Sequence, residues 1–332
     1  MIYKEKILKI INTEVKFDNS IVLAELLGIF DENLDVLMRE TTTTIYVEEN
    51  ALKISGEQEN VNLAEKVITK LLDILRIGEK IDKSRIVYCI DLARNGKVDD
   101  IEKVVSGVIA VTSRGKQIKC KTVGQKVYVD AIKNNTIVFG VGPAGTGKTY
   151  LAVALAVTAY KNKEVEKIIL TRPAVEAGEK LGFLPGDLQT KVDPYLRPLF
   201  DALQEMFGLE NYQRLMEKGV IEIAPLAYMR GRTLSDSFII LDEAQNTTKE
   251  QMKMFLTRMG EGSKMVITGD ITQIDLPEGK QSGLKHAISI LKQVENLDIV
   301  HLTHKDVVRH PLVAEIIKAY TKHEEKLIEN KK

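Results

Sequence analysis

The sequence predicts an α/β protein whose larger part is a parallel β-sheet covered by helices on both faces, preceded by a small α+β domain. Three observations predict this fold class. Residues 129–320 alternate between short β-branched runs and longer helical segments. A glycine-rich turn, residues 142–149, joins the first of these runs to a helix. Residues 1–78 differ, because two adjacent strands lie between helices there. Strand–helix alternation is typical of parallel sheets, since each parallel crossover needs a helix.

Composition limits the class of protein. The chain has 332 residues, 44% of them hydrophobic, and equal numbers (47 each) of Lys+Arg and Asp+Glu. This length suggests about two domains, and zero net charge argues against coating of nucleic acid by bulk charge, although a local basic groove is compatible with it. Cys89 and Cys120 lack metal-type spacing, so we expect reduced thiols. Without a signal peptide or a long apolar window, we expect a cytoplasmic chain with no membrane span.

The first block, residues 1–78, predicts strands at 15–17, 41–48 and 51–55 and helices at 19–27, 31–40 and 60–75. The last helix is amphipathic. The helix–strand–strand–helix order resembles a KH-like RNA-binding module. The Gly-x-x-Gly backbone clamp of that module is absent, and Gly28-Ile-Phe-Asp31 stands in its place. RNA binding and a purely structural or oligomerising role are both open for this block.

Residues 79–128 predict a helical linker followed by a basic segment. Residues 79–110 have helical character, with helices at 82–95 and 98–105. Residues 111–128 contain five cations and no acid, namely Arg114, Lys116, Lys119, Lys121 and Lys126. Either a solvated loop or a contact to a nucleic-acid backbone would account for this charge.

Residues 129–322 form the second block, and residues 323–332 a charged tail. The expected strands cover residues 137–141, 167–171, 220–224, 237–241, 264–268 and 298–302. The expected helices cover residues 148–160, 187–207, 210–218, 248–259, 279–292 and 306–319.

The turn after the first strand of this block is a phosphate-binding loop. Its residues are Gly142, Pro143, Ala144, Gly145, Thr146, Gly147, Lys148 and Thr149. A strand, a glycine-rich turn and a helix in this order aim backbone N–H groups at an anion. We therefore expect Lys148 to reach the β- and γ-phosphates of ATP and Thr149 to bind Mg²⁺.

Two acids follow the apolar strand at 237–241. Asp242 is the expected carboxylate on the Mg²⁺ side and completes a metal site with Thr149, whereas Glu243 is placed to polarise an attacking water. Two carboxylates at one buried strand end are costly without a cation. The wide spacing from Lys148 to Asp242 resembles the additional-strand class of P-loop ATPases, with a RecA-like core. No Asn-Lys-x-Asp sequence for guanine is present.

Three further segments resemble motifs of superfamily 1 helicases. Gly269-Asp270-x-x-Gln273 resembles the third motif, so Gln273 is a candidate sensor of the γ-phosphate, together with Thr268 and Asp270. Residues 301–311 resemble the fourth motif, whose arginine, here Arg309, meets that phosphate. Residues 122–128 resemble the glutamine motif, in which Gln125 would read adenine and an aromatic would stack on it. A surface arginine and a polar turn are the alternatives.

The stretch from Leu170 to Pro198 is the most distinctive, with Thr-Arg-Pro-Ala-Val-Glu-Ala-Gly-Glu-Lys-Leu-Gly at its centre. Together with the phosphate loop and Asp242-Glu-Ala-Gln-Asn246, it resembles the PhoH-like ATPase family over residues 111–320. Residues 1–78 resemble the domain that precedes this ATPase in full-length bacterial members. One departure is Cys120-Lys121, where relatives often have Pro-Arg. The resemblance implies ATP binding, a cytoplasmic location, ring-like assembly and a link to RNA metabolism.

These expectations combine into a Mg²⁺-dependent ATPase that acts on RNA or ribonucleoprotein as a helicase or remodeller. The alternative is an ATP-gated RNA-binding adaptor that recruits a ribonuclease and hydrolyses slowly. Arg172 corresponds to a position where helicases contact nucleic acid, and a loop with Gly178, Gly182 and Gly186 follows it. Because one core leaves the nucleotide open on one side, we expect a homo-oligomer in which Arg309, or else Arg232 or Arg258, completes the site.

Overall fold

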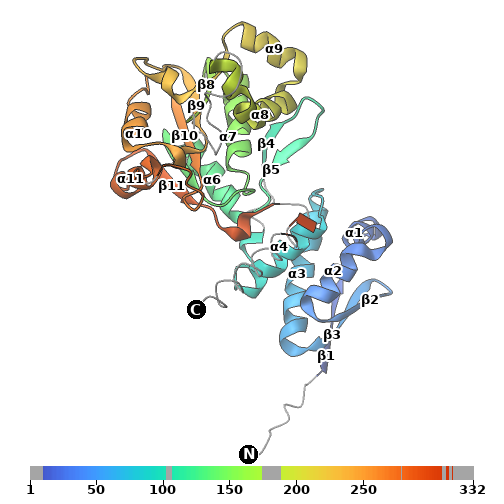
Figure 1. Cartoon of the computed structure of the whole chain (residues 1–332). Coiled ribbons are helices and arrows are strands. Elements are labelled where there is room, and N and C mark those ends of the chain that lie inside the picture. Colours follow the sequence, from blue (N-terminus) through green and yellow to red (C-terminus); the bar gives the residue numbers. More distant parts are fainter. Residues whose placement is uncertain are drawn as a thin grey trace, which may run out of the picture. The chain divides into compact units, whose positions relative to one another are not determined.

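The computed structural model describes residues 10–101, 107–173, 188–277, 279–308, 312, 313 and 316 (Figure 1). The chain divides into two compact units. The described residues up to 101 belong to the first unit, and residues 107–308 form the second. The sequence pattern instead predicts that residues 107–128 belong to the linker and basic segment, and the predicted domain boundaries stay predictions.

The first unit contains one antiparallel sheet and four α-helices among the described residues. The strands are β1 (Ile10–Lys16), β2 (Thr44–Glu48) and β3 (Ala51–Glu57), in the spatial order β1-β3-β2. The helices are α1 (Ser20–Leu27), α2 (Glu32–Thr41), α3 (Gln58–Arg76) and α4 (Lys83–Arg94). The predicted helix–strand–strand–helix order is confirmed by α2, β2, β3 and α3. The face predicted for the last helix, from Val61 to Leu75, is buried in the core as expected from its 3.6-residue period.

The loop between α1 and α2 replaces the missing Gly-x-x-Gly clamp. Gly28 has φ 79°, and Phe30 and Asp31 have φ 54° and 60°. A left-handed conformation is unfavourable for residues with a Cβ, by about 1–2 kcal/mol each. The Phe30 side chain is 95% exposed, so local packing does not explain this strained loop. RNA binding and a structural role both stay open for the first unit.

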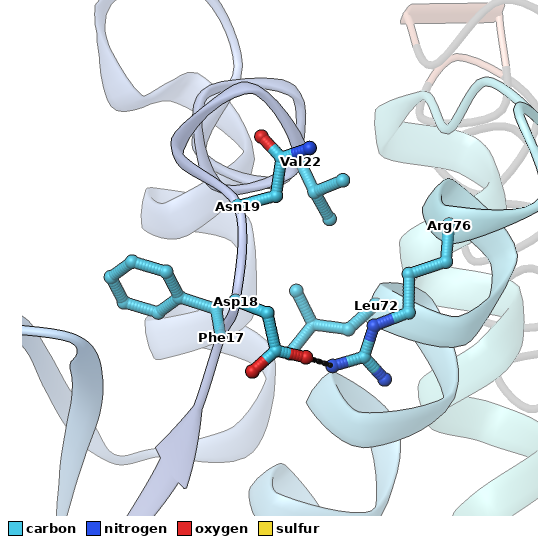
Figure 2. A pocket seen from close by; sticks show the side chains of 6 residues that line it. All are labelled: Phe17, Asp18, Asn19, Val22, Leu72 and Arg76. Atoms are coloured by element: carbon cyan, nitrogen blue, oxygen red, sulfur yellow. Dashed lines mark hydrogen bonds and ion pairs between the residues drawn. The ribbon is translucent and has the colours of Figure 1, made fainter.

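A pocket in the first unit lies between the end of β1, the start of α1 and α3 (Figure 2). Arg76 contributes the positive charge of its lining. The Arg76 guanidinium donates to Asp18 at 3.2 Å and to Asp73 at 2.8 Å. Because both carboxylates already compensate this charge, the pocket has little capacity to attract an anion.

The second unit contains a six-stranded parallel sheet with the order β11-β6-β10-β9-β7-β8. Its strands are β6 (Ile137–Val141), β7 (Lys167–Arg172), β8 (Ile221–Pro225), β9 (Ser237–Leu241), β10 (Lys264–Gly269) and β11 (Leu297–His301). β10 therefore lies between β6, which leads into the phosphate loop, and β9, which leads into the two acids. The strands that lie between Lys148 and Asp242 in the sequence, β7 and β8, are beyond β9, and the inserted strand β10 comes later in the chain. The predicted α/β class with a RecA-like core is confirmed.

Helices cover both faces of this sheet because successive strand residues point to opposite sides. Val138, Ile240 and Val266 pack with α6 (Val123–Asn134), α7 (Lys148–Lys161), α8 (Leu188–Phe207) and α9 (Leu209–Glu217). Phe139 and Ile239 pack instead with α10 (Lys249–Leu256) and α11 (Gly283–Ile290) (Figure 1). The buried core thus holds the strand ends, and the loops after them, in fixed positions.

Local structure differs from the sequence prediction in several places. Helix α6 was not among the predicted helices, and Thr41, predicted as the start of a strand, is the last residue of α2. Residues 108–111 are strand β4, not helix, because they pair with β5 (Gln117–Lys119) and bury Ile109 against α7. The helix predicted at 248–259 already ends at Leu256, and the helix predicted at 279–292 covers only Gly283–Ile290, where Ser282 caps its N-terminus. A 3-10 turn at His304–Asp306 begins the segment predicted as helix 306–319, most of which lies outside the described residues.

Candidate nucleotide-binding site

The glycine-rich loop lies between β6 and α7, as the sequence predicts. Gly145 and Gly147 have φ 85° and 81°, the left-handed region that favours glycine. A Cβ on Gly142 would lie 2.5 Å from the Leu302 carbonyl oxygen, so glycine is required for the close approach of this segment. No side chain caps the N-terminus of α7, which leaves its first N–H groups free to bind an anion.

Lys148 is folded back over the loop. Its buried ammonium donates to the carbonyls of Gly142 at 2.6 Å and Pro143 at 2.8 Å. Burial lowers the pKa of Lys148, and the nearby Asp270, Asp242 and Glu243 carboxylates oppose that shift. A phosphate would form stronger, charge-assisted hydrogen bonds than these two neutral carbonyls. The residues and their positions therefore fit a phosphate group.

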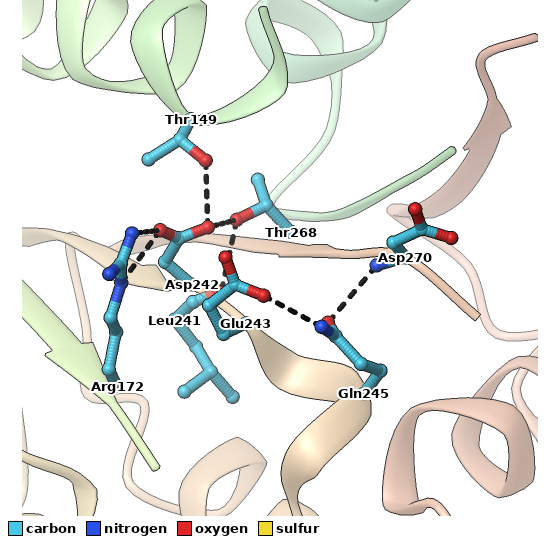
Figure 3. Close-up of polar contacts among 8 residues, drawn as sticks. All are labelled: Thr149, Arg172, Leu241, Asp242, Glu243, Gln245, Thr268 and Asp270. Carbon is cyan, nitrogen blue, oxygen red and sulfur yellow. Dashed lines mark hydrogen bonds and ion pairs between the residues drawn. The ribbon is translucent and has the colours of Figure 1, made fainter. Parts of the chain in front are cut away.

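Asp242 is at the centre of a compact polar cluster (Figure 3). Its Oδ1 accepts from the hydroxyls of Thr149 at 2.7 Å and Thr268 at 2.6 Å. Its Oδ2 accepts from Arg172 Nε at 2.9 Å and from the Nη2 of the same guanidinium. Thr149 and Asp242, the predicted metal ligands, are therefore in direct contact. Carboxylate and hydroxyl oxygens are ligands that Mg²⁺ prefers, so the donor set fits this ion.

The surroundings of Arg172 differ from those expected of a residue that contacts nucleic acid. Sequence similarity associates this position with nucleic acid, but in the structure its guanidinium pairs with Asp242, and the two side chains are only 14% and 5% exposed. β7 and β9 are neighbours in the sheet, and Thr171 is level with Leu241. The residues that follow each of these positions therefore lie next to one another. Only the strand order predicts this pair, because 70 residues separate its members.

Glu243 follows Asp242 but lies in a different environment. It is exposed, whereas Asp242 is buried, and its φ of 53° is left-handed. Strained backbone of this kind is concentrated at functional sites. Its carboxylate Oε2 accepts from Gln245 Nε2 at 2.7 Å, and Gln245 Oε1 accepts from the Asp270 N–H at 3.0 Å. No role was predicted for Gln245 beyond its place in the motif Asp242-Glu-Ala-Gln-Asn246.

The end of β10 holds the other predicted sensors. Thr268 is buried against Asp242, and Asp270 accepts from the Thr272 N–H at 2.9 Å. Gln273 is exposed at the same edge, and its N–H donates to the Asp270 carbonyl at 3.2 Å. The three candidates thus lie on one short segment beside the loop. The γ-phosphate role of each stays a prediction.

The residues of the glutamine motif connect α6 to the phosphate loop. Gln125 is buried, accepts from the Lys121 N–H at 2.7 Å and donates to the Thr146 carbonyl at 3.0 Å. Main-chain groups therefore occupy both ends of the Gln125 amide. The predicted reading of adenine by this residue stays a prediction. Tyr128, the aromatic of this motif, is fully buried below the sheet residue Gly140, and burial raises the pKa of its hydroxyl well above the ordinary value. It is therefore too enclosed to stack on a base.

The three arginines predicted as candidates for completing the site lie in different surroundings. Arg309 lies outside the described residues. The segment before it contacts the loop, because the Val308 N–H donates to the Gly145 carbonyl at 2.9 Å. Arg232 pairs with Glu222 through two hydrogen bonds of 2.5 and 2.7 Å, and Arg258 donates to the Arg232 carbonyl at 3.1 Å. The glycine-punctuated loop, with Gly178, Lys180, Gly182 and Gly186, also lies outside the described residues, as does the side chain of Lys191.

The basic segment forms most of a β-hairpin and the start of α6. The two alternatives for its charge, a solvated loop and a contact to a nucleic-acid backbone, stay predictions. Arg114, Lys116 and Lys119, here called the hairpin cations, lie in or beside the β4–β5 turn, and the first two are exposed. Lys126 instead pairs with Asp130 at 2.6 Å. In the described part of the chain, no helix combines the length and apolarity needed to cross a membrane.

Comparison with known proteins places this site in a family. The family model described as PhoH-like protein matches residues 117–321. A PhoH-like protein of Bacillus subtilis (strain 168) is 52% identical over 307 residues, 92% of this chain and 96% of the relative. A PhoH-like protein of Mycobacterium tuberculosis (strain ATCC 25618 / H37Rv) is 56% identical over 301 residues, 90% of this chain and 85% of the relative. The protein PhoH of Escherichia coli (strain K12) is 45% identical over 206 residues, 61% of this chain and 58% of that protein.

Proposed function

The chain belongs to the PhoH-like protein family, a family of P-loop proteins, and from this premise we propose that it is a Mg²⁺-dependent ATPase acting on RNA or ribonucleoprotein. The observation that carries the proposal is the joint position of four groups at one sheet edge. Lys148 and Thr149 lie at the start of α7, Asp242 contacts Thr149, and Glu243 follows Asp242 on the exposed side. A phosphate binder, a metal ligand and a base are together the parts that ATP hydrolysis needs.

The proposed reaction is in-line attack of water on the γ-phosphorus of ATP. Lys148 exchanges its two carbonyl partners for phosphate oxygens, and Thr149 and Asp242 are the residues that would hold Mg²⁺. When bound, Mg²⁺ neutralises charge on the phosphates. Glu243 orients the water and accepts its proton as the new oxygen–phosphorus bond forms and the bond to ADP breaks. Thr268 keeps Asp242 oriented through its 2.6 Å hydrogen bond.

Glu243→Gln tests this proposal, because it removes the base and keeps the shape of the side chain. ATP affinity should stay within about twofold, while turnover should fall by about 10²-fold or more. Glu261→Gln is a matched control, since Glu261 is an exposed glutamate in the loop before β10. Wild-type turnover in Glu243→Gln would remove this residue from the mechanism.

RNA is the proposed partner, and the hairpin cations are the proposed contact. Arg114 and Lys116 are exposed at the turn and Lys119 is half-buried beside it, and this cluster of charge favours contact with a phosphate backbone. The control uses three exposed lysines outside the hairpin, here called the opposite-edge lysines: Lys163, Lys167 and Lys218. Lys167 is the first residue of β7, and the other two precede β7 and β8, at the edge of the sheet away from the phosphate loop. RNA-stimulated turnover would favour a motor or remodeller. Slow turnover that RNA leaves unchanged would favour the adaptor that recruits a ribonuclease.

We also propose a cytoplasmic homo-oligomer in which a neighbouring subunit completes the site. The described part of the second unit contains one parallel sheet, so we expect a single chain to cover the nucleotide on one side only. Cys89 and Cys120 are both free and buried, which agrees with a reducing compartment.

A further inference from the structure

Gln245 lies at the centre of a hydrogen-bonded bridge between the ends of two neighbouring strands. It belongs to the 3-10 turn Ala244–Asn246 that follows β9, and it is only 1% exposed. Its Oε1 accepts from the Asp270 N–H at the end of β10, and its Nε2 donates to the Glu243 carboxylate (Figure 3). The mechanism above assigns no task to this buried side chain.

The fold fixes the direction in which the Gln245 amide points. The Asp270 N–H is only a donor, so the amide oxygen must face it and the NH₂ group must face Glu243. A Cβ on Gly269 would lie 2.8 Å from Gln245 Oε1 and 2.6 Å from Leu284 Cδ2. Glycine at the end of β10 therefore provides the space that this amide occupies.

Glu243 needs an external support. Its side chain is exposed, so packing places little restraint on it. Its backbone is left-handed, a conformation that residues with a Cβ rarely adopt. A base acts efficiently only when it is held in the productive geometry, and a displacement of about 1 Å can cost about 10²-fold in rate. A hydrogen bond to an ionised carboxylate is among the stronger ones in proteins. The 2.7 Å bond from Gln245 is suited to supply this restraint.

We propose that Gln245 is a positioning residue, which holds the Glu243 carboxylate in the orientation used to activate water and ties it to the end of β10. This inference rests on the proposed role of Glu243. Because Asp270 and Gln273 lie on the segment after β10, the bridge also couples the base to the segment that contains the candidate sensors of the γ-phosphate.

Gln245→Glu is the most selective test. The new side chain keeps the acceptor for Asp270 but presents a carboxylate, in place of an NH₂ donor, to Glu243. We expect turnover to fall about 10- to 100-fold, while the KM for ATP and the affinity for a fluorescent ATP analogue stay within about twofold. Gln245→Met, which adds no charge, should give the same kinetic pattern if the glutamate variant folds poorly.

Asn246→Ala is the matched control. Asn246 lies in the same buried turn, and its side chain accepts from the Asp275 N–H at 2.8 Å. Its backbone N–H donates to the Glu243 carbonyl at 3.0 Å, a contact that alanine keeps. This variant should lower the melting temperature but keep turnover within about threefold, as expected for a structural contact. A loss of turnover equal to that of Gln245→Met would overturn the positioning role.

The reciprocal swap Glu243→Gln with Gln245→Glu gives a readout that is independent of turnover. We expect Gln245→Glu to lower the melting temperature, because two carboxylates then face each other. In the swap, an amide at position 243 can donate to a carboxylate at position 245, so the melting temperature should rise again toward the wild-type value. Turnover should stay as low as in Glu243→Gln alone, because the base is absent.

The outcomes separate the two proposals. If Glu243→Gln is inactive but both Gln245 variants keep turnover within about twofold, the inference about Gln245 is wrong and the proposed function stands. If Glu243→Gln has wild-type turnover, the proposed function fails. Addition of Gln245→Met to Glu243→Gln should cost no further activity, and a fully additive loss would overturn the coupling.

Discussion

The ion pair between Arg172 and Asp242 gives a prediction of stability that can be worked from the structure. Arg172→Gln leaves the Asp242 carboxylate buried without its cation. Removal of one partner from a buried pair costs about 3–5 kcal/mol. The hydroxyls of Thr149 and Thr268 still donate to Asp242, so we expect the lower end of this range, about 3 kcal/mol. For a unit of this size that corresponds to a fall of about 6–12 °C in melting temperature.

The control is Arg232→Gln, which breaks an ion pair of similar length at the surface. Arg232 and Glu222 are 36% and 34% exposed, and their hydrogen bonds and charges raise the pKa of Arg232. Exposed pairs contribute about 0–1 kcal/mol, so we expect a fall of at most about 4 °C.

Differential scanning calorimetry without nucleotide measures both variants. The transition that shifts upward on addition of Mg²⁺ and ATP analogue identifies the second unit. Arg172→Gln combined with Asp242→Asn should be more stable than Arg172→Gln alone, because neither residue is then a buried, unpaired charge. The reasoning is refuted if Arg172→Gln and Arg232→Gln melt within about 2 °C of each other.

Four other features of the chain give measurable outcomes. Lys148→Ala should remove detectable binding of a fluorescent ATP analogue, because the cation nearest the phosphates is lost, and retained micromolar affinity would contradict its role. Substitution of the hairpin cations by glutamate should weaken binding of single-stranded RNA and reduce the slope of log K against log salt concentration by about 2. The same substitution of the opposite-edge lysines should change neither quantity. An unchanged slope in the hairpin variant would show that the segment is merely solvated. Specific ATPase activity should rise with protein concentration. A mixture of Lys148→Ala and Arg309→Ala subunits should regain activity if Arg309 acts on the site of a neighbouring subunit. A dilute monomer with full activity would refute the shared site. Burial raises the pKa of Cys89 to about 12 and that of Cys120 to about 11, so the thiolate fraction is small and native protein should not react with maleimide at about pH 8, unlike unfolded protein.

The local pattern of the sequence was sufficient for the strands of the parallel sheet and for the residues that follow them. The left-handed glycines Gly145 and Gly147 lie where the spacing of the phosphate loop requires them. The β-branched runs form strands at the predicted positions along the chain, because burial on both faces of a parallel sheet selects such residues. Asp242 and Glu243 follow one of these runs directly, so their place at a strand end was also predictable.

The basic segment shows where a local pattern was insufficient. Five cations without an acid suggested a loop, but Ile109 and Ile118 are buried and determine a hairpin. The apolar residues are few in this segment, and their burial depends on packing against α7. A short strand stabilised by distant contacts carries little periodic signal of its own.

The sequence by itself determined which residues follow each strand and which chemistry they can perform. Only the tertiary structure decided which of them meet. Insertion of β10 between β6 and β9 brings Thr268 to Asp242 and the Asp270 N–H to Gln245, and the pairing of β7 with β9 brings Arg172 to Asp242. Strand order results from how the helices and both sheet faces pack together. It has no signature within a single segment, so contacts between residues far apart in the chain appear only in the folded molecule.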